Sequence, residues 1–544
     1  MKLVTIPQMH LIEQEADSGG LSYEKMMENA GNNLSKEVLQ LAYAQDDEEE
    51  IQVLGLVGPG NNGGDTLVAL THLAEKGWKA RAYLMHRKVA GDALIKRLEE
   101  ASGEVYPADK DDNFHQLQAF LESADVVLDG VLGTGIKLPL KDEFGSVLAA
   151  VQGILTEMEW PPYIIAVDCP SGIDCDSGRV APQTVPADAT VTMAAIKQGL
   201  LKLPAYDMIG ELRVVEIGPL DDLNSWKAIK NEVADEGLAK SLLPFRPTDA
   251  HKGTFGTALI AAGSINYTGA AFLAGKAAYR IGAGLVTLAI PASLHGALAG
   301  QFPEATWVLL PHELGVISSG AADVLKKNLD RATALLVGPG LGMEDTTKDF
   351  IANLLNIAED KHIHGRLGFV QADAEKPGSK SVPLPAMIFD ADGLKLLAKL
   401  PGWPKLLPAP AILTPHPGEM SVLTGLTIEE IQKDRLKVAS KFAQEWGHVV
   451  VLKGAFTVIA APDGRTTTIP VATPALARAG TGDVLAGLIT GLRAQGVDAY
   501  DAARAGAWIH AQAGLTAARL QGSMAAVMAG DVLDAIPDVI ADLE

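Results

Sequence analysis

Residues 51–76 read IQVLGLVGPGNNGGDTLVALTHLAEK, and this stretch decides the fold. Its apolar start, Ile51–Val57, is typical of a strand buried on both faces of a sheet. A glycine-rich turn follows, and Thr66–Lys76 then has the periodicity of an amphipathic helix. A strand joined to a helix through such a turn predicts an α/β fold with a mainly parallel sheet.

The same alternation of apolar runs and amphipathic stretches continues along the whole chain. In the first half, further strands are predicted over Arg81–Met85, Val126–Asp129, Tyr163–Asp168 and Ala189–Ala194. In the second half, they are predicted over Thr257–Ala262, Leu285–Ile290, Leu335–Gly338, Ala386–Asp390, Ala411–Thr414 and Val449–Lys453. The two halves share an architecture but not their motifs.

The chain has 544 residues, which is too long for a single hydrophobic core. The segment Pro219–Pro247 is polar and bounded by prolines, as a linker between domains would be. We therefore expect one domain over residues 1–222 and a second over residues 236–544. The polar segment Glu359–Pro383 is expected to be a surface insertion within the second domain.

Charge and composition exclude several classes of partner. A net charge of −22 argues against nucleic acids and anionic membranes, because phosphates are bound by clustered lysine and arginine. No run approaches the roughly 18 apolar residues of a membrane span, and Glu13 and Glu15 interrupt any N-terminal signal. Cys169 and Cys175 lie outside any CxxC or Cys/His cluster and are expected to be reduced thiols. We expect a cytoplasmic protein that acts on small molecules.

Three loops after predicted strands in the first half carry polar side chains. The turn GPGNNGGD, residues 58–65, combines glycines that permit positive φ and close backbone approach with a helix start that can bind anions. The loops DGVLGTGIK, residues 129–137, and DCPSGID, residues 168–174, each begin with an acid. Because the C-terminal strand ends meet at one crevice in open α/β sheets, these loops are expected to share a site.

Residue chemistry indicates two roles within that site. Asn62, Asp129 and Ser171 offer hard oxygen ligands, which suit an alkali or alkaline-earth cation rather than zinc. Asp168 and Lys137 are candidates for proton transfer, because a crevice can shift the pKa values of such groups toward neutrality.

The segment RAGTGDVLAG, residues 478–487, is the strongest motif of the second half. Gly480–Gly482 lead into a predicted helix over Val484–Gln495, so their N–H groups would form an anion hole. Asp483 lies in the first turn, where it could accept a proton from a hydroxyl directed at a phosphate.

Other strand-end loops of the second half surround this motif. Lys453 and Thr457, in LKGAFT, are placed to meet nucleotide phosphates, and TPHPGE brings His416 and Glu419 to another strand end. Asp390 is expected to orient a substrate or a hydrated magnesium ion. No G-x-x-x-x-G-K-[ST] loop or protein-kinase motif set is present, which indicates another nucleotide-binding design. The remaining motifs are FDADG (389–393), VGPGLG (337–342), HKGTFG (251–256) and YTGAA (267–271).

Over roughly residues 1–220, the three first-half loops together resemble the NAD(P)HX epimerase family, the YjeF amino-terminal domain. The resemblance implies a Rossmann-like αβα sandwich that binds K⁺ and interconverts the R and S forms of NAD(P)H hydrated at C6 of the nicotinamide ring. It also implies Asn62, Asp129 and Ser171 as potassium ligands, and Lys137 and Asp168 as the acid/base pair. The substrate contacts that it implies are Asn61, Asn62, Gly63, Gly64, Asp65, Gly133, Thr134, Gly135, Ile136, Lys137, Leu138, Pro139 and Asp168.

Over roughly residues 238–543, the second half is similar to the ribokinase-like superfamily, and within it to the ADP- or ATP-dependent NAD(P)HX dehydratase family. This implies a ribokinase-like α/β domain with ADP or ATP as co-substrate, Mg²⁺ as cofactor and Asp483 as the catalytic base. The implied substrate contacts are Ala270, Gly340, Gly342, His416 and Asp483, and the implied nucleotide contacts are Lys453, Gly454, Ala455, Phe456, Thr457, Gly480, Thr481 and Gly482.

Together the two resemblances imply a bifunctional enzyme that epimerises hydrated NADH and NADPH and dehydrates the S form, and a homo-oligomeric assembly. Two alternatives stay open. The second half could be a small-molecule kinase for a vitamin precursor or sugar, and the first half could be a non-catalytic dinucleotide-binding scaffold. A hydride-transferring dehydrogenase is disfavoured, because no G-x-G-x-x-G fingerprint follows the first strand.

Overall fold

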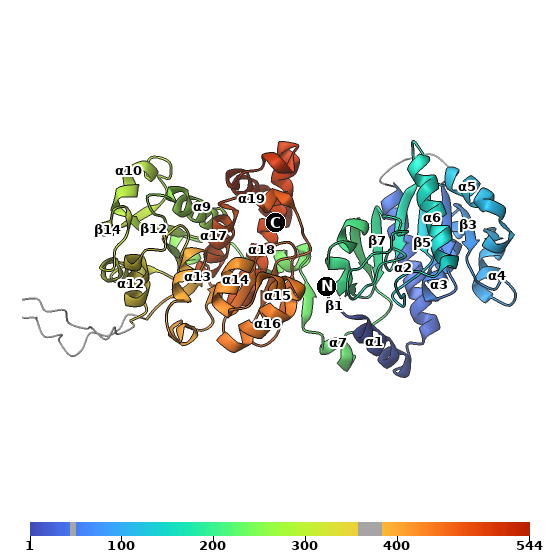
Figure 1. Ribbon diagram of the computed structural model, residues 1–544, viewed down its shortest axis with the longest axis horizontal. Helices are drawn as coiled ribbons and strands as arrows, with labels where there is room; N and C mark the ends of the chain where they lie inside the picture. The colour runs from blue at the N-terminus through green and yellow to red at the C-terminus, as the bar shows by residue number, and fades with distance from the viewer. Residues whose placement is uncertain (44–50, 357–382) are drawn as a thin grey trace, which may run out of the picture. The chain divides into compact units, whose positions relative to one another are not determined.

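The computed structural model describes residues 1–43, 51–356 and 383–544. The chain forms two compact units, Met1–Val233 and Ala234–Glu544. Figure 1 colours the first unit from blue to green and the second from green to red. Much of the segment predicted to be a linker is ordered as α7 (Asn224–Lys227), β10 (Asn231–Val233) and α8 (Glu236–Leu242). The predicted surface insertion lies outside the described residues, apart from Pro383.

The first unit contains a seven-stranded parallel sheet in the order β4-β3-β2-β5-β6-β7-β9. The order reverses between β2 and β5, and such a switch point opens a crevice at the carboxyl ends of the strands. The strands are β2 (Gln52–Val57), β3 (Lys79–Leu84), β4 (Glu104–Pro107), β5 (Val126–Gly130), β6 (Tyr163–Val167), β7 (Ala189–Met193) and β9 (Glu211–Val215).

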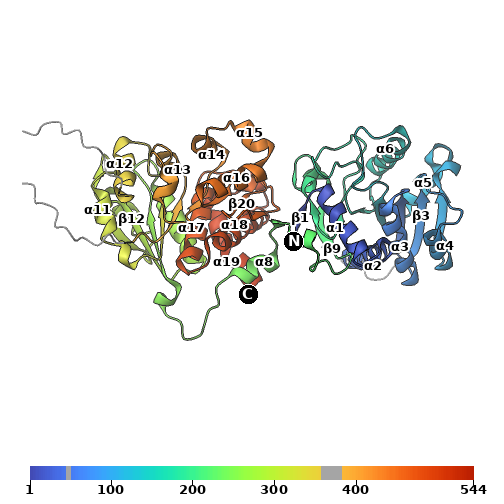
Figure 2. The same ribbon diagram turned by 90° about the horizontal axis from the view of Figure 1, so that it is seen from below.

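Helices cover both faces of this sheet (Figure 2). One face packs against α1 (Ile6–Ser18), α2 (Tyr23–Tyr43), α3 (Asn61–Glu75) and α4 (Ala93–Glu100), and the other against α5 (His115–Glu122) and α6 (Asp142–Glu157). Helix α3 begins earlier than predicted, so the polar residues after β2 form its first turn. Their N–H groups therefore lie at a helix start, directly beside the switch point.

The second unit has its own sheet, in which the order is β21-β20-β19-β18-β17-β16-β11-β12-β13. The run from β19 to β13 is parallel, and β20 and β21 add an antiparallel hairpin. The strands are β11 (Thr257–Ala261), β12 (Leu285–Pro291), β13 (Thr306–Leu310), β16 (Ala334–Val337), β17 (Ala386–Phe389), β18 (Ile412–Leu413), β19 (Val449–Leu452), β20 (Val458–Ala460) and β21 (Thr466–Thr468).

Helices again lie on both faces of this second sheet. The largest apolar core lies between one face and α8, α9 (Thr268–Arg280), α17 (Thr481–Ala494), α18 (Ala499–Gln521) and α19 (Ala529–Leu543). The opposite face packs against α11 (Ala321–Lys326), α12 (Asp345–Leu354), α13 (Asp392–Leu397) and α16 (Arg435–Trp446). The predicted α/β class is confirmed for both units.

The strands predicted from apolar runs are all present, whereas several short strands were missed. Among the missed strands, β4, β9 and β13 lie at sheet edges, where a strand needs no continuous apolar run, and β20 and β21 are three-residue strands of an antiparallel hairpin. Among the described residues, no helix has the length and apolar character needed to cross a membrane.

Candidate active sites

The crevice of the first unit is a cavity of about 1080 Å³. It lies where the sheet order reverses, and its walls come from the turn after β2, the loop after β5, and helices α1 and α2. The predicted residues that line it are Asn61, Asn62, Asp65, Gly133, Thr134, Gly135, Ile136, Lys137, Pro139 and Asp168. The predicted residues Gly63, Gly64, Leu138, Asp129 and Ser171 are not part of its lining.

The glycines at the start of α3 permit close packing, and none of them has a positive φ. A Cβ atom on Gly63 would lie 2.0 Å from the carbonyl oxygen of Gly58, and one on Gly64 would lie 2.6 Å from the Met27 sulfur. The expectation of positive φ was therefore wrong, whereas the expectation of close backbone approach is confirmed. This packing brings the N–H groups at the start of α3 close to the neighbouring loop.

Asp168 lies directly after β6 with a φ of 65°, which is unusual for a residue with a side chain. Its Oδ1 accepts hydrogen bonds from Thr192 Oγ1 at 3.0 Å and from the Met193 N–H at 2.9 Å, and it also pairs with the ammonium of Lys197. No hydrogen bond from another described residue reaches Oδ2. One oxygen is therefore fixed by three donors, while the other is available to a ligand in the cavity.

The lysine that pairs with Asp168 is Lys197 rather than the predicted Lys137. Lys197 follows β7 in the strand β8 (Ile196–Lys197), and only 1% of its side chain is exposed. Lys137 lies on the cavity wall with an exposed side chain. The proton-transfer role of Lys137 stays a prediction. Sequence reasoning missed Lys197, whose only signal is a lysine at the end of the apolar run ATVTMAAIK.

Two further carboxyl groups of the first unit hold protons more tightly than usual. Burial raises the pKa of Glu13, which lines the cavity from α1, although the charge of Lys197 opposes this effect. Burial, reinforced by the negative charge of Asp168, raises the pKa of Asp65 well above its ordinary value. Asp65 was predicted as a substrate contact, whereas Glu13 was not predicted as a site residue.

Asp129 and Ser171 lie beside the cavity as a hydrogen-bonded pair. The Ser171 hydroxyl donates to Asp129 Oδ1 at 2.6 Å, and the Ser171 N–H donates to Oδ2 at 2.7 Å. Asn62 Nδ2 donates to the carbonyl oxygens of Val167 at 2.6 Å and Leu132 at 3.2 Å, which connects the three loops. Burial raises the pKa of Asp129, and no ion pair joins it to a described lysine or arginine. These side chains and carbonyls are hard oxygen donors, as a potassium site requires.

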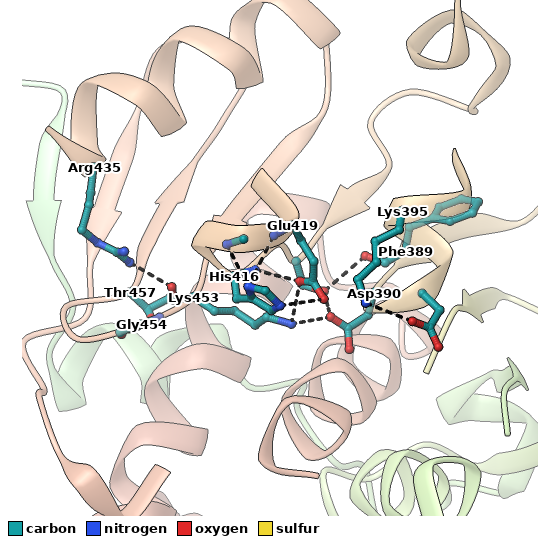
Figure 3. A network of polar contacts seen from close by, with 12 residues as sticks. Phe389, Asp390, Lys395, His416, Glu419, Arg435, Lys453, Gly454 and Thr457 are labelled. Atoms are coloured by element: carbon teal, nitrogen blue, oxygen red, sulfur yellow. Dashed lines mark hydrogen bonds and ion pairs between the residues drawn. The ribbon is translucent and has the colours of Figure 1, made fainter. Parts of the chain in front are cut away.

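In the second unit, three neighbouring parallel strands deliver the charged groups of a network (Figure 3). Asp390 follows β17, Glu419 lies in α14 (Pro417–Thr424) after β18, and Lys453 follows β19. The Lys453 ammonium lies 2.6 Å from Asp390 Oδ1 and 3.6 Å from Glu419 Oε2. Burial opposes the charge of Lys453, but the two carboxylates outweigh this effect and raise its pKa. The network is therefore an ammonium held between two buried carboxylates.

His416, predicted to contact substrate, has a structural role in the fold. Its Nδ1 accepts a hydrogen bond from the Gly418 N–H at 2.9 Å, so its ring caps helix α14. Its other nitrogen, Nε2, lies 3.3 Å from Glu419 Oε1. About half of the His416 side chain is exposed, and burial of the remainder lowers its pKa. The ring is therefore fixed by its cap and still accessible to a ligand.

The predicted nucleotide loop, Lys453–Thr457, is held by an arginine that sequence reasoning missed. Arg435 begins α16 and donates to the carbonyl oxygens of Leu452 at 2.8 Å and Lys453 at 3.1 Å. Burial lowers the pKa of Arg435 to about 10. Thr457 closes the loop by donating to the Gly454 carbonyl at 2.9 Å (Figure 3).

The start of α17 meets the same network. Gly480 has a φ of 92° as the N-cap residue, and a Cβ on Gly482 would lie 3.6 Å from Lys453 Nζ. Burial, reinforced by the negative charge of Asp390, raises the pKa of Asp483 to about 7. A carboxyl group with a pKa near neutrality thus lies in the first turn of a helix and close to a lysine.

The remaining predicted contacts are Gly340 and Gly342, on the glycine loop after β16, and Ala270, in α9. Gly340 has a φ of 62°, and a Cβ there would lie 3.0 Å from that of Ala270, so the loop packs against the start of α9. Gly342 has a φ of 86° and donates its N–H to Asp392 Oδ2 at 3.1 Å. Asp392 therefore orders this glycine loop.

Comparison with known proteins assigns each unit to a family. Residues 258–538 match the family described as NAD(P)H-hydrate dehydratase, and residues 23–199 match the family described as YjeF-related protein N-terminus. A bifunctional NAD(P)H-hydrate repair enzyme of Moorella thermoacetica is 35% identical over 100% of this chain and 97% of its own length. The enzyme of the same name from Escherichia coli is 32% identical over 93% of this chain and 88% of its own.

Solved structures similar to parts of the chain include a Bacillus subtilis protein. It is an ADP/ATP-dependent NAD(P)H-hydrate dehydratase co-crystallised with ATP and Mg²⁺, with 31% identity and a TM-score of 0.45. The similarity covers 58% of this chain and 100% of that one.

Proposed function

This chain belongs to the family of bifunctional NAD(P)H-hydrate repair enzymes, and from that premise we propose how its two units divide the work. The first unit epimerises the R and S forms of NADH and NADPH hydrated at C6. The second unit dehydrates the S form to NAD(P)H at the expense of ADP or ATP. The relatives that match nearly the whole chain are named as bifunctional NAD(P)H-hydrate repair enzymes. The alternative that the second unit is a small-molecule kinase is therefore not favoured.

The observation that carries the dehydratase assignment is the surroundings of Asp483. The second unit transfers a phosphoryl group from the nucleotide to the C6 hydroxyl, and Asp483 takes the hydroxyl proton. A carboxylate with a pKa of about 7 suits this task near neutral pH. The N–H groups of Gly480–Gly482 stabilise the transferred charge. Phosphate then leaves C6 more readily than hydroxide would, and loss of a proton from C5 restores the ring double bond.

The nucleotide contacts are assigned to the loop that Arg435 supports. Lys453, Gly454, Ala455, Phe456 and Thr457 bind the nucleotide together with the anion hole of Gly480, Thr481 and Gly482. The proximity of Lys453 to Gly482 supports this grouping. The hydrated cofactor is assigned to Ala270, Gly340, Gly342, His416 and Asp483.

Magnesium suits the donors in this site. Asp390 and Glu419 supply buried carboxylate oxygens, the ligand type that Mg²⁺ prefers. The described residues contain no group of three or more His, Cys, Asp or Glu side chains placed to hold a metal ion. This agrees with the usual way in which Mg²⁺ binds, through one or two carboxylates together with phosphates of the nucleotide. When bound, the ion neutralises charge that develops on the phosphates.

In the first unit, Asp168 acts on the C6 hydroxyl, and the cavity of about 1080 Å³ holds the dinucleotide. The side chains of Asn62, Asp129 and Ser171 would hold K⁺ beside it. The buried Asp129 carboxylate, which lacks a described cationic partner, supports this choice. When bound, the ion supplies a fixed positive charge next to the loops that bind substrate. Homo-oligomeric assembly and a cytoplasmic location stay predictions.

The test follows absorbance at the dihydronicotinamide band from an R/S mixture of hydrated NADH, with K⁺, Mg²⁺ and either ADP or ATP. We expect recovery of both epimers with the wild type, recovery of only the S share with Asp168→Ala, and none with Asp483→Asn. No recovery by the wild type with either nucleotide would refute the dehydratase assignment. A stable phosphorylated product, in place of free phosphate, would point to the kinase alternative.

A further inference from the structure

Helix α1 carries a carboxyl group on the face where its other inward residues are apolar. Met9, Ile12, Glu13 and Ala16 have the spacing of one helical face, and the three apolar members are buried in the first unit's core. Glu13 is half-buried and lines the cavity together with Met9 and His10. No hydrogen bond or ion pair joins its carboxyl to another described residue. A carboxyl in that position stabilises neither the helix nor the core.

The structure fixes α1 firmly relative to the Asp168–Lys197 pair. The strand β1 (Leu3–Val4), directly before α1, pairs with β8, so that Val4 lies opposite Lys197 itself. The N–H of Ile6 donates to Asp176 Oδ1 at 2.9 Å, and at the other end Glu15 accepts from the Ser225 N–H at 2.8 Å. Helix α1 is therefore held at both ends, and its first residues are joined to the strand that carries the lysine.

Several charged groups face Glu13 across the cavity. Lys197 of β8 and His10 of α1 itself lower the pKa of Glu13, whereas Asp168, after β6, raises it. Asp65 of α3 lies in the same group, because its own pKa is raised by the charges of Asp168 and Glu13. Burial outweighs the favourable charges at Glu13, so the carboxyl keeps its proton to a higher pH than an exposed glutamate.

We propose that Glu13 is the second proton-transfer residue of the epimerase site and acts opposite Asp168 on the hydrated nicotinamide ring. This inference rests on the epimerase activity proposed above for the first unit. It assigns the second proton-transfer residue to α1, whereas the predicted site residues come from the loops after β2, β5 and β6.

The step balances with these two carboxyl groups alone. Asp168 Oδ2 takes the proton of the C6 hydroxyl, the C6–O bond becomes a carbonyl, and the C6–N1 bond breaks with its electron pair going to N1. Glu13 gives its proton to N1. Rotation about the C5–C6 bond presents the other face of the carbonyl, and N1 attacks it. Glu13 then recovers the N1 proton, while Asp168 returns its proton to the oxygen, which yields the opposite epimer.

Lys197 fits this scheme as a positioning residue. Its ammonium pairs with Oδ1 of Asp168 and is also fixed by Thr192 Oγ1 at 3.0 Å and the Met193 carbonyl at 2.9 Å. Because these three acceptors hold the ammonium, Lys197 stabilises the Asp168 carboxylate and does not exchange protons with substrate. The second proton must therefore come from another group in the cavity, and Glu13 is less deeply buried than Asp65.

The test measures interconversion of purified R and S hydrated NADH by chromatography, with no ADP or ATP present, so that the dehydratase is silent. We expect Glu13→Gln to lower kcat by ~10²–10⁴-fold while binding of oxidised NADP, as the probe, changes less than threefold. The wild-type rate should fall as the pH rises through the pKa of Glu13, since the protonated form is needed. That decline should be absent in Glu13→Gln and retained in Glu13→Asp.

The controls separate the possible outcomes. Glu24→Gln removes an exposed carboxylate from α2 outside the cavity and should leave rate and pH profile unchanged. If the wild type interconverts the epimers and Glu13→Gln keeps its rate and alkaline decline, the inference is wrong and the epimerase stands. Loss of the alkaline decline in Asp65→Asn instead would also overturn it. A wild type no faster than buffer would refute the epimerase itself.

Discussion

At the scale of the residue, each unit surrounds one predicted acid with other polar side chains. In the second unit, burial and Asp390 raise the pKa of Asp483 to about 7, while Lys453 limits the rise. In the first unit, three donors fix one oxygen of Asp168. Both acids were predicted as site residues from their motifs. The sequence could not identify Lys197 or Glu13, because their roles depend on which side chains meet across the fold.

The pKa of Asp483 predicts the pH dependence of dehydration. The carboxyl must be ionised to act as a base, so kcat for the S epimer should rise as the pH increases through about 7. Asp483→Asn should lower kcat by ~10²–10⁴-fold and remove this rise. Phosphate release from pH 5.5 to 8.5 measures both. A wild-type rate independent of pH over this range would contradict the assignment of Asp483 as the base.

The buried pair of Asp168 and Lys197 predicts a stability effect. Lys197→Met leaves the carboxylate without its cationic partner, which should lower the free energy of unfolding of the first unit by about 3–5 kcal/mol. Adding Asp168→Asn to this variant should recover much of the loss, because the uncompensated charge is removed. Denaturant unfolding measures the difference. Lys137→Met, at an exposed position, is the control and should change stability little; an equal loss there would contradict the pairing.

At the scale of the element, the interior parallel strands were predictable, whereas the edge strands and the hairpin of β20 and β21 were not. Apolar runs such as VVVL in β19 predict strands correctly because they are buried on both faces. The edge strand β4 reads EVYP and is only partly buried, so its pattern resembles that of a loop. The start of α3 was also missed, because its first residues are asparagines and glycines, which have low helix propensity. The close packing of Gly63 against Gly58 explains why the helix begins there.

That packing predicts the effect of a single methyl group. Gly63→Ala would place a Cβ about 2.0 Å from the Gly58 carbonyl oxygen, so the turn or the helix start must move. We expect a loss of roughly 1–3 kcal/mol in stability and weaker binding of the dinucleotide. Gly153→Ala is the matched control within α6, where nothing lies within 4 Å of the new Cβ. It should be neutral or stabilise by about 0.5–1 kcal/mol; similar losses in both variants would exclude the steric explanation.

At the scale of the whole molecule, the chain consists of two units that each have their own sheet and core. No core cluster of the described residues crosses from Val233 to Ala234. Motifs predicted which loops lie close together within each unit, because each motif follows a strand and strand ends converge. The junction was less predictable, since the polar segment between the units contains short helices and a strand.

Separate sites predict that two defective full-length proteins should complement each other. A mixture of Asp168→Ala and Asp483→Asn should convert both epimers to NADH, because the S epimer released by one protein can be taken up by the other. Final absorbance, compared with that of each variant alone, measures this. Recovery no greater than that of Asp168→Ala alone would mean that the two steps must take place on one chain.

The pairing of β1 with β8 matters for anyone who purifies the protein. The first four residues include the strand partner of Lys197 and lead into the helix that carries Glu13. Proteolysis of these residues, or an amino-terminal tag that disrupts the pairing of β1 with β8, would lower the epimerase activity and leave the dehydratase activity unchanged. A preparation with a ragged amino terminus should therefore process the S epimer at full speed and accumulate the R epimer, a defect that a routine assay on the S epimer alone would not reveal.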